Sequence, residues 1–324
     1  MSIAVVIVTY NSTSTIGDCL AALDAQIRSP ERIVIIDNAS PAGFPSDVLK
    51  NRPSIEFVRN NQNVGFASAN NQALSMLSGD VEFVALLNPD AFPEPTWLAE
   101  LESAARRFPD VDAFASRMMI ASSGNLVDGT GDEYHVSGLA WRSNHGMRLQ
   151  PKHLVAREVF AVCAGAALYR IDALRRVGGL DDELFCYLED IDLAFRLRRT
   201  GGRCRYVPSA VVWHVGGEST KDNAGFRLYY GHRNMIRVYL KNMPIGLLLA
   251  TLPLHVAVNI AAIIRSMWRG DARVVLRAKI DALRALPRIL AQRRDLLRTA
   301  TAGSTTIWRH LTIAPWRSVR PRRD

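Results

Sequence analysis

Apolar and polar segments alternate along the first half of the chain. Short runs rich in Val and Ile predict buried strands, and between them apolar residues recur at helical spacing. The predicted strands lie at 3–8, 32–36, 55–58 and 81–87, and the predicted helices lie near 15–25, 66–77 and 97–108. This alternation predicts an α/β fold with a doubly wound, mostly parallel sheet.

The pattern is less regular beyond residue 120. The Gly- and Ser-containing stretch 122–145 predicts irregular or hairpin structure. An apolar run at 159–169 predicts a strand, and residues 189–199 predict a helix that ends before Gly201 and Gly202. Residues 203–207 predict one more strand. These elements form a second mixed α/β region.

The last part of the chain differs in kind. Residues 245–264 are nearly all apolar and are just long enough to span a bilayer, although Pro253, His255 and Asn259 lie among them. Two adjoining faces follow at helical spacing, an apolar one made of Leu276, Ile280, Leu283 and Leu290 and a basic one made of Arg273, Arg277, Arg284 and Arg288. This pattern is typical of a basic amphipathic segment.

This tail carries the positive charge of the protein. Residues 241–324 hold 16 Lys and Arg against 4 Asp and Glu, so they contribute +12 to a net charge of +9. The excess predicts an anionic surface as partner. A single span would place the basic end outside the cell, against the tendency of basic flanks to stay in the cytoplasm, so we favour an in-plane or re-entrant membrane segment. The alternative is an ordinary pair of core helices broken at Pro253, with a basic face that is simply solvated.

Composition excludes a disordered protein, because 48% of the 324 residues are hydrophobic and 22% are charged. The four cysteines form no C-x-x-C pair, which fits a reducing cytosol. The N-terminus has no basic region or cleavage site before its first apolar strand. We therefore expect no secretion.

Polar side chains follow the predicted strands at the sheet edge where open α/β folds bind ligands. Thr9, Tyr10 and Asn11 follow the first strand, and this loop is not the Gly-rich loop of dinucleotide binders or P-loop proteins. Asp37 and Asn38 end the second strand. That pair suits a base or a ribose, or else it merely forms a turn.

Two groups of acids suggest catalysis. Asp90 ends an apolar strand at a proline turn, and Glu189, Asp190 and Asp192 begin a helix much later in the chain. One carboxylate could hold a metal on a phosphate while another takes a proton from a substrate. Acids in a first helical turn also oppose the helix dipole, which most simply explains Asp192.

Five segments, in this order, closely resemble the family 2 glycosyltransferases of GT-A fold, particularly the bacterial branch that includes rhamnosyltransferases of cell-surface polysaccharide synthesis. The segments are Val6-Ile7-Val8-Thr9-Tyr10-Asn11, Ile36-Asp37-Asn38-Ala39-Ser40, residues 63–71, Leu87-Asn88-Pro89-Asp90 and residues 189–196. The resemblance covers about residues 3–242. It implies a GT-A catalytic domain at 1–242, with a nucleotide-sugar half at about 1–120 and an acceptor half at about 121–242. A helical, membrane-associating tail would follow at 243–324.

The resemblance also implies a donor site and a metal site. The donor would be bound by Thr9, Tyr10, Asn11, Asp37, Asn38, Asn63, Gly65, Asn70, Asn88 and Asp90. Asp90 matches the last acid of the family's metal motif, whereas the first acid is replaced by Asn88, a neutral oxygen ligand still acceptable to Mg²⁺ or Mn²⁺. His214 resembles the histidine that completes the metal site in some relatives, and the alternative is a buried histidine at a strand end.

For catalysis, the resemblance implies an inverting transfer in which Asp190 is the general base. Glu189 would position the acceptor or raise the basicity of Asp190. Asp192 would contact the acceptor, unless it only serves the helix dipole. Arg233 would meet an acceptor diphosphate or pair with a carboxylate of the site.

Together these features predict a metal-dependent enzyme, peripheral or monotopic at the cytoplasmic face of the cell membrane. It would move a sugar from a nucleotide donor, with dTDP-L-rhamnose leading and UDP-sugars open, to a lipid-linked or polysaccharide acceptor. A sugar-phosphate nucleotidyltransferase would need a Gly-rich loop with a basic residue after the first strand. A non-catalytic nucleotide- or membrane-binding adaptor is disfavoured by the acids Asp90 and Asp190. No nucleic-acid partner is expected, because the tail lacks interleaved aromatics.

Overall fold

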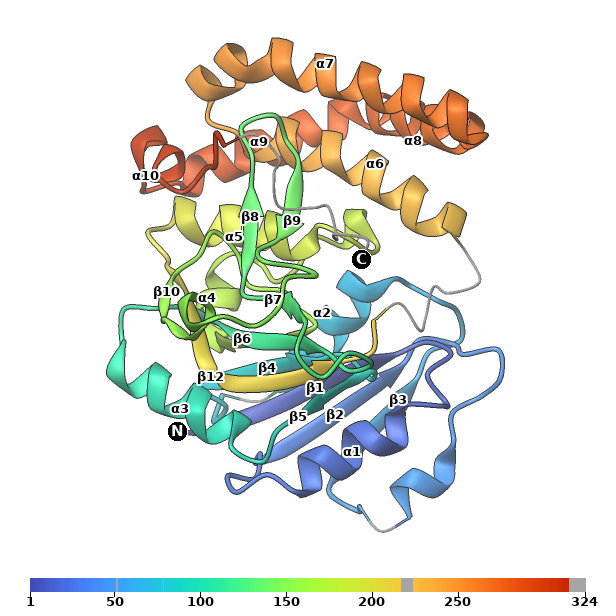
Figure 1. The fold of residues 1–324 in the computed structure, drawn as a ribbon, viewed down its shortest axis with the longest axis vertical. Coiled ribbons are helices and arrows are strands. Elements are labelled where there is room, and N and C mark those ends of the chain that lie inside the picture. The colour runs from blue at the N-terminus through green and yellow to red at the C-terminus, as the bar shows by residue number, and fades with distance from the viewer. Residues whose placement is uncertain (51, 78, 217–223, 315–324) are drawn as a thin grey trace.

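The computed structural model describes residues 1–50, 52–77, 79–216 and 224–314. Its main sheet is mixed and has ten strands, in the order β10, β12, β6, β11, β4, β1, β2, β3, with β5 added on β12 and β7 on β6 (Figure 1). Their bounds are β1 (Ile3–Thr9), β2 (Arg32–Asp37), β3 (Ile55–Arg59), β4 (Phe83–Leu87), β5 (Ala91–Pro93), β6 (Ala113–Ile120), β7 (Val127–Gly129), β10 (Arg157–Glu158), β11 (Ala166–Arg170) and β12 (Cys204–His214). The predicted α/β class is confirmed.

The first four strands form the parallel part of the sheet. β1 pairs in parallel with β2 on one side and β4 on the other, and β3 extends β2. Every residue of β1 is buried, because helices cover both faces of the sheet. Parallel strands end at the same edge, so the polar loops after β1, β2 and β4 lie together there.

Two cores lie on either side of this sheet. Ile3, Val5 and Ile7 pack against α1 (Ile16–Asp24) and α3 (Trp97–Arg107). Their neighbours in β1 point to the other face, toward α2 (Phe66–Met76), α4 (Ile171–Arg176) and α5 (Glu189–Arg199). The alternation of side chains along each strand therefore gives a three-layer arrangement.

The second half completes the same sheet. The stretch 122–145 contains the hairpin of β8 (Asp132–Tyr134) and β9 (Ala140–Arg142), as the sequence indicated. The single strand predicted at 159–169 is wrong, since only β10 and β11 are strands and residues 159–165 form a buried connection between them. The strand predicted at 203–207 continues to His214 as β12, with a register shift between Val207 and Val211.

The C-terminal region is helical, as predicted. It contains α6 (Ala224–Asn242), α7 (Ile245–Arg269), α8 (Ala272–Arg284), α9 (Leu286–Thr299) and α10 (Ser304–Trp308). α7 passes through Pro253 without a break, which excludes both a re-entrant turn there and a helix pair broken at that residue. α7 lies at the end of the molecule opposite the parallel strands (Figure 1). The division of the chain at residue 242 stays a prediction.

Candidate active site

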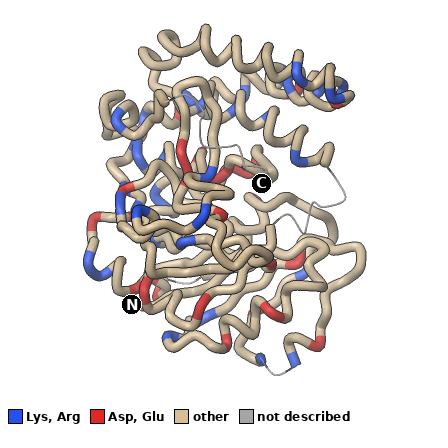
Figure 2. Tube along the Cα trace, viewed as in Figure 1, with Lys and Arg blue, Asp and Glu red and all other residues tan. Residues whose placement is uncertain are grey.

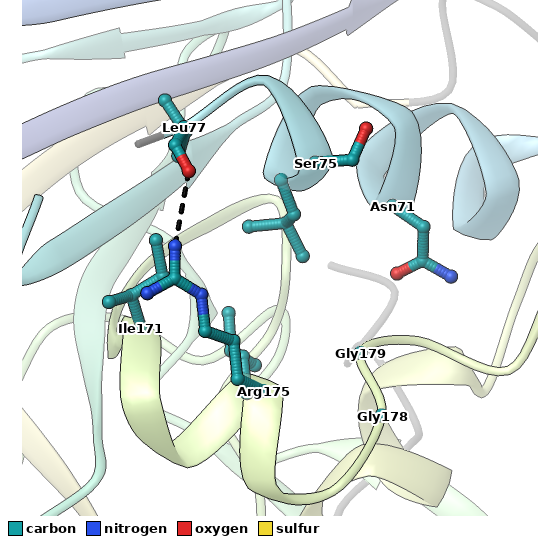
Figure 3. A pocket seen from close by; sticks show the side chains of 9 residues that line it. Asn71, Ser75, Leu77, Ile171, Arg175, Gly178 and Gly179 are labelled. Carbon is teal, nitrogen blue, oxygen red and sulfur yellow. Dashed lines mark hydrogen bonds between the residues drawn. The ribbon is translucent and has the colours of Figure 1, made fainter. Parts of the chain in front are cut away.

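A cavity of about 1130 Å³ opens at the carboxyl edge of the sheet. Nine of the side chains singled out from the sequence line it, namely Tyr10, Asn11, Asn38, Asn63, Asn88, Asp90, Glu189, Asp190 and His214. A smaller cavity of about 380 Å³ lies between α2 and α4 and contains none of the predicted site residues (Figure 3). The larger cavity is therefore the candidate active site.

The loops after β1 and β2 are held by a buried carboxylate. Asp37 is fully buried and accepts hydrogen bonds from the hydroxyls of Thr9, at 3.0 Å, and Ser40. Neither Thr9 nor Asp37 lines the cavity. They shape the floor of the predicted donor site, while Tyr10, Asn11 and Asn38 face its interior.

The loop before α2 is folded around Asn38. Its Oδ1 accepts from the backbone N–H of Val64 at 3.0 Å, and its Nδ2 donates to Oδ1 of Asn63 at 2.8 Å. Gly65 has a φ of 90°, and a Cβ there would lie 2.7 Å from Phe185. Its missing side chain thus makes room for Phe185. Asn70 is buried and donates to the carbonyl of Phe66, so it stabilises α2 and does not line the cavity.

Asp90 and His214 are brought together by strand pairing. β5 pairs with β12 so that Ala91 lies opposite His214, which places Asp90 beside the histidine. The two side chains approach to 3.3 Å between Oδ1 and Nε2, and both are almost fully buried. The other ring nitrogen of His214, Nδ1, lies 2.8 Å from Oδ2 of Asp128. Asp90, His214 and Asp128 therefore form a continuous polar chain.

Asp128 is stabilised in its charged form by its neighbours. Burial alone would raise its pKa, but hydrogen bonds from His145 and His214 and the charge of Arg142 hold that pKa well below its usual range. Burial alone would likewise lower the pKa of His214, but its contacts with Asp128 and Asp90 raise it. Asp128 thus stays ionised and fixes the orientation of the imidazole.

Three further acids gather at the wall formed by α5 and the hairpin. Burial, reinforced by the charge of Asp190, raises the pKa of Glu189 to about 8 and lifts that of Asp132 well above its usual range. Burial also raises the pKa of Asp190, although the N–H of Ile191, 2.8 Å from Oδ1, and the charge of Arg142 oppose it. The pKa values of all three acids are thus raised, and together the three can hold and release protons near neutral pH.

Cys163 lies beside these acids, with ligand atoms of Asp132, Cys163 and Asp190 within 4.8 Å of one another. Burial raises the pKa of the Cys163 thiol well above its usual range. A neutral thiol is a poor metal ligand, because metals bind the thiolate.

The family model of glycosyl transferase family 2 matches residues 4–178, more than half of the chain. The chain belongs to this family. A curated relative, the N-acetylglucosaminyl-diphospho-decaprenol L-rhamnosyltransferase of Mycobacterium tuberculosis, is 28% identical over 253 residues, which cover 71% of this chain and 81% of the relative. The predicted family, and with it the glycosyltransferase class of enzyme, is confirmed.

Solved structures share the GT-A fold of this glycosyltransferase. Mannosyltransferase PcManGT from Pyrobaculum calidifontis, in complex with GDP-Man and Mn²⁺, aligns with a TM-score of 0.56 at 18% identity, covering 95% of this chain and 87% of that one. GalNAc-T7 with UDP, GalNAc and Mn²⁺ aligns with a TM-score of 0.58 at 17% identity, covering 74% of this chain and 48% of that one. At these identities the likeness concerns the fold alone.

The geometry of this glycosyltransferase fits a divalent cation. Nε2 of His214 is buried and points at the Asp90 carboxylate, 3.3 Å from its Oδ1, so the two side chains offer ligand atoms to the same point. A metal-ligating histidine typically donates its other nitrogen to a carboxylate, as His214 does to Asp128. Imidazole and carboxylate ligands suit Mn²⁺. Asn88 lines the same cavity and offers a neutral oxygen.

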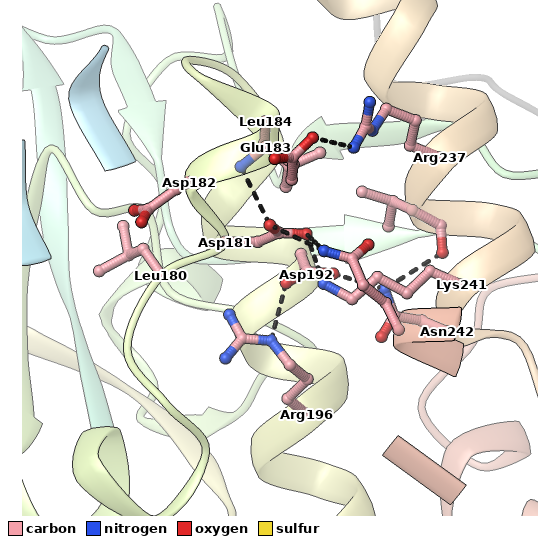
Figure 4. A network of polar contacts seen from close by, with 12 residues as sticks. Leu180, Asp181, Asp182, Glu183, Leu184, Asp192, Arg196, Arg237, Lys241 and Asn242 are labelled. Carbon is pink, nitrogen blue, oxygen red and sulfur yellow. Dashed lines mark hydrogen bonds and ion pairs between the residues drawn. The ribbon is translucent and has the colours of Figure 1, made fainter. Parts of the chain in front are cut away.

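The two residues predicted to contact the acceptor lie outside the cavity. Asp192 is fully buried among Arg196, Lys241 and Asn242 (Figure 4), which an acceptor contact does not fit. Arg233 donates to backbone carbonyls of the loop before α5 and lies 4.6 Å from the centre of the Tyr230 ring. The carboxylate pair expected of Arg233 is not present among the described residues, and its contact with an acceptor diphosphate stays a prediction.

Sequence reasoning missed the contribution of the stretch 122–145 to the site. Asp128, Asp132, Arg142 and His145 all line the cavity. Asp128 lies on β7, which pairs with β6 next to β12, and this pairing brings it to His214. The only available signal was the cluster of acids and glycines at 128–132, which reads equally well as a turn.

Proposed function

We propose that this protein is an inverting glycosyltransferase that moves a sugar from a nucleoside-diphosphate donor to a lipid-linked or growing polysaccharide acceptor in cell-surface glycan synthesis. The observation that carries the proposal is the single cavity that joins Asp190 to Asp90 and His214. The name of the mycobacterial relative supports an L-rhamnosyl donor and a lipid-diphosphate acceptor. dTDP-L-rhamnose is therefore the leading donor.

In this proposal the acceptor enters beside α5. The carboxylate of Asp190 takes the proton of an acceptor hydroxyl, whose oxygen bonds to the anomeric carbon while the bond from that carbon to the diphosphate oxygen breaks. Burial raises the pKa of Asp190, which strengthens it as a base. Glu189 lies in the same wall of the cavity and helps to hold the acceptor.

The donor would lie along the polar loops at the sheet edge. Tyr10, Asn11, Asn38 and Asn63 line the part of the cavity that receives the nucleotide and ribose. Asp90 and His214, with Asn88, would hold a Mg²⁺ or Mn²⁺ ion at the diphosphate. When bound, the cation supplies positive charge to the departing diphosphate.

A membrane-facing tail would bring this cavity to a lipid-linked acceptor. α7 is long and apolar enough to cross a bilayer, with a mean hydropathy of 2.2 and only 11% of its apolar window buried. Its buried residues are His255, Asn259 and Ser266. His255 contacts the carbonyl of Ser137 at 2.7 Å and stacks on Tyr239. The helix thus turns its polar side to the protein and its apolar side outward, which is typical of a surface that faces lipid.

The neighbouring helices extend this outward face. The apolar face predicted in the tail is also exposed, and it consists of Leu276, Ile280, Leu283 and Leu290. Lys and Arg gather at the C-terminal end of α7 and on α8 (Figure 2). Exposed apolar and basic groups together favour an anionic bilayer surface. Because the polar side of α7 is bonded to the protein, we propose that α7 lies in the plane of the membrane at its cytoplasmic face.

A donor panel tests the enzymatic part of this proposal. The protein is incubated with dTDP-L-rhamnose, UDP-hexoses, UDP-N-acetylhexosamines and UDP-galactofuranose, with Mn²⁺ or Mg²⁺ and a polyprenyl-diphosphate-linked N-acetylglucosamine acceptor. Release of dTDP that depends on the acceptor supports the proposal. Turnover of a UDP-sugar would mean that this sugar nucleotide, and not dTDP-L-rhamnose, is the donor. If no donor releases its nucleoside diphosphate, transfer to this class of acceptor is contradicted.

A further inference from the structure

The segment before α5 has an uncommon backbone. Phe185, with φ 64° and ψ −63°, is the centre of the rarer form of γ-turn, in which the N–H of Cys186 donates to the carbonyl of Leu184 at 2.7 Å. Tyr187 and Leu188 follow with φ of 69° and 66°. Residues with side chains rarely adopt positive φ, and such a backbone persists only where its surroundings hold it.

Helix α6 supplies these surroundings. Nδ2 of Asn234 lies 2.8 Å from the carbonyl oxygens of Leu184 and Cys186 and 2.7 Å from that of Tyr187. Asn234 is fully buried, so water does not compete for these carbonyls. One carboxamide therefore contacts the backbone on both sides of the γ-turn.

Arg233 orients this carboxamide. Its Nε donates to Oδ1 of Asn234 at 2.9 Å, which leaves Nδ2 directed at the carbonyls. Its Nη2 donates to the carbonyls of Glu183 at 2.9 Å and Leu184 at 2.8 Å. The two adjacent residues of α6 thus contact the carbonyls of every residue from 183 to 187 except Phe185.

Phe185 connects the same segment to the donor side of the cavity. Its carbonyl accepts from the N–H of Ala67 at 3.2 Å, in the first turn of α2. The segment ends at the first residues of α5, Glu189 and Asp190. A shift of this backbone would therefore move Asp190 relative to the donor loop.

We propose that Asn234 is a positioning residue for sugar transfer. Its carboxamide holds the backbone of residues 184–187, in which Phe185 and Tyr187 have positive φ, and this backbone sets where Asp190 meets the acceptor hydroxyl. Arg233 acts through Asn234 by fixing the orientation of the carboxamide. The inference rests on the proposed role of Asp190 as general base, whereas the contacts with the backbone do not depend on it.

The chain offers a matched control for Asn234. Asn242 is also a fully buried asparagine of α6, but it donates to Oδ1 of Asp192 at 2.7 Å and to the carbonyl of Val238 (Figure 4). It makes none of the contacts to residues 184–187. Loss of Asn242 therefore tests the general effect of removing a buried amide from α6.

The experiment compares Asn234→Asp with Asn242→Ala in the full-length protein. Asn234→Asp keeps the shape and the contact with Arg233 but removes the donor to the carbonyls. We expect kcat for the donor that the panel identifies to fall about tenfold or more, because small misplacement of a reacting group is costly. Donor KM should stay within about twofold, because the variant keeps the residues that line the donor side of the cavity and bind the donor before and during the reaction. Amide hydrogen exchange of residues 186–191 should accelerate in the Asn234 variant and not in the Asn242 variant.

Asn234→Ala is the second variant if Asn234→Asp does not fold, and it should give the same pattern. Unchanged exchange at 186–191 in a folded Asn234 variant would overturn the inference. Equal losses of kcat in the Asn234 and Asn242 variants would overturn it too, because both would then reflect general destabilisation. A wrong assignment of Asp190 as the base would show itself differently. In that case Asp190→Asn would still transfer sugar, while hydrogen exchange of residues 186–191 would still accelerate in the Asn234 variant.

Discussion

Asp190 lies in the first turn of α5, where its Oδ1 accepts from the N–H of Ile191 at 2.8 Å. Asp190→Asn keeps the volume of the side chain and removes its capacity to take a proton. We expect kcat to fall about 10²- to 10⁴-fold, the usual contribution of a general base, with little change in donor KM. Steady-state release of the nucleoside diphosphate measures both constants.

The control for this variant is Asp172→Asn on α4, whose side chain is 90% exposed. It should leave kcat unchanged. If Asp190→Asn keeps a substantial part of the wild-type kcat, another group must take the proton, and Glu189 would be the next candidate because it lines the same cavity.

Glu189 makes the stability of the protein depend on pH. Its pKa is raised from 4.5 to about 8, first by burial and then by the charge of Asp190. Between these values the folded protein keeps a proton that the unfolded chain has lost, so the free energy of unfolding falls as pH rises. The contribution is at most about 1.4 kcal/mol per pH unit.

Glu189→Gln should flatten this dependence, because glutamine has no proton to lose. Urea unfolding of the wild type and the variant at about pH 5, 6.5 and 8 measures the difference. The variant should gain stability relative to the wild type as pH rises through this interval. Parallel curves would show that Glu189 is ionised in the folded protein throughout.

Some residues of the site could be predicted from the sequence next to them, whereas others reach the site only through contacts with distant parts of the chain. Asp90 and Asp190 each end or begin a recognisable element, so the sequence was enough to predict that both lie at the cavity. Asp128 acquires its role only through pairing of β7 with β6 beside β12, and no local pattern encodes that contact. Asp192 sits in a similar helical turn to Asp190, yet faces α6 and is fully buried.

At the scale of elements, α5 is fixed to α6 by a buried ion cluster (Figure 4). Nζ of Lys241 lies 2.6 Å from Oδ2 of Asp181 and 2.7 Å from Oδ1 of Asp192. Lys241→Met removes the cation and leaves two buried carboxylates behind. We expect a loss of about 3–5 kcal/mol in the free energy of unfolding, measured with urea.

Arg298→Met is the comparison for Lys241→Met. Arg298 pairs with Asp295 at 3.2 Å, but the two side chains are 79% and 73% exposed. Solvent screens such a pair, so its loss should cost less than about 1 kcal/mol. Similar losses in both variants would mean that burial does not determine the strength of the Lys241 cluster.

Two of the longer elements that the sequence missed, β6 and α6, share one property, an apolar pattern interrupted by polar groups with buried partners. β6 contains Ser116, which accepts from the indole N–H of Trp97 at 2.8 Å, and so its apolar run is broken. α6 buries Asn234, Arg237, Lys241 and Asn242. By contrast, β1 to β4 are apolar runs. Such a run predicts a strand even when the residues that pack against it are unknown, and all four were predicted.

At the scale of the whole molecule, the outward apolar face of α7 predicts membrane binding that is separable from folding. Leu249, Ile260 and Ile264 are 62%, 52% and 49% exposed. Replacing all three with Gln should reduce sedimentation with anionic phosphatidylglycerol vesicles, while the free energy of unfolding changes by only about 1 kcal/mol.

A matched triple variant carries the same change elsewhere. Ile27, Leu154 and Val155 are also exposed, and they belong to the predicted catalytic domain at 1–242. Their replacement with Gln should leave vesicle binding unchanged, and equal binding by both triple variants and the wild type would refute the membrane face. Deleting residues 245–324 is a poorer test, because Arg293 of α9 donates to the carbonyl of Leu240 in α6 and would be lost.

The place of β12 within the sheet has a consequence for how the chain is made. β12 lies between β10 and β6, although it is the last strand of the sheet to leave the ribosome. Until residues 204–214 emerge, the edge of β6 is unpaired, and an unpaired edge can associate with other chains. The nascent protein therefore passes through an interval in which nine of the ten strands of the sheet are present but the strand that joins β10 to β6 is missing, and conditions that slow translation there should favour aggregation.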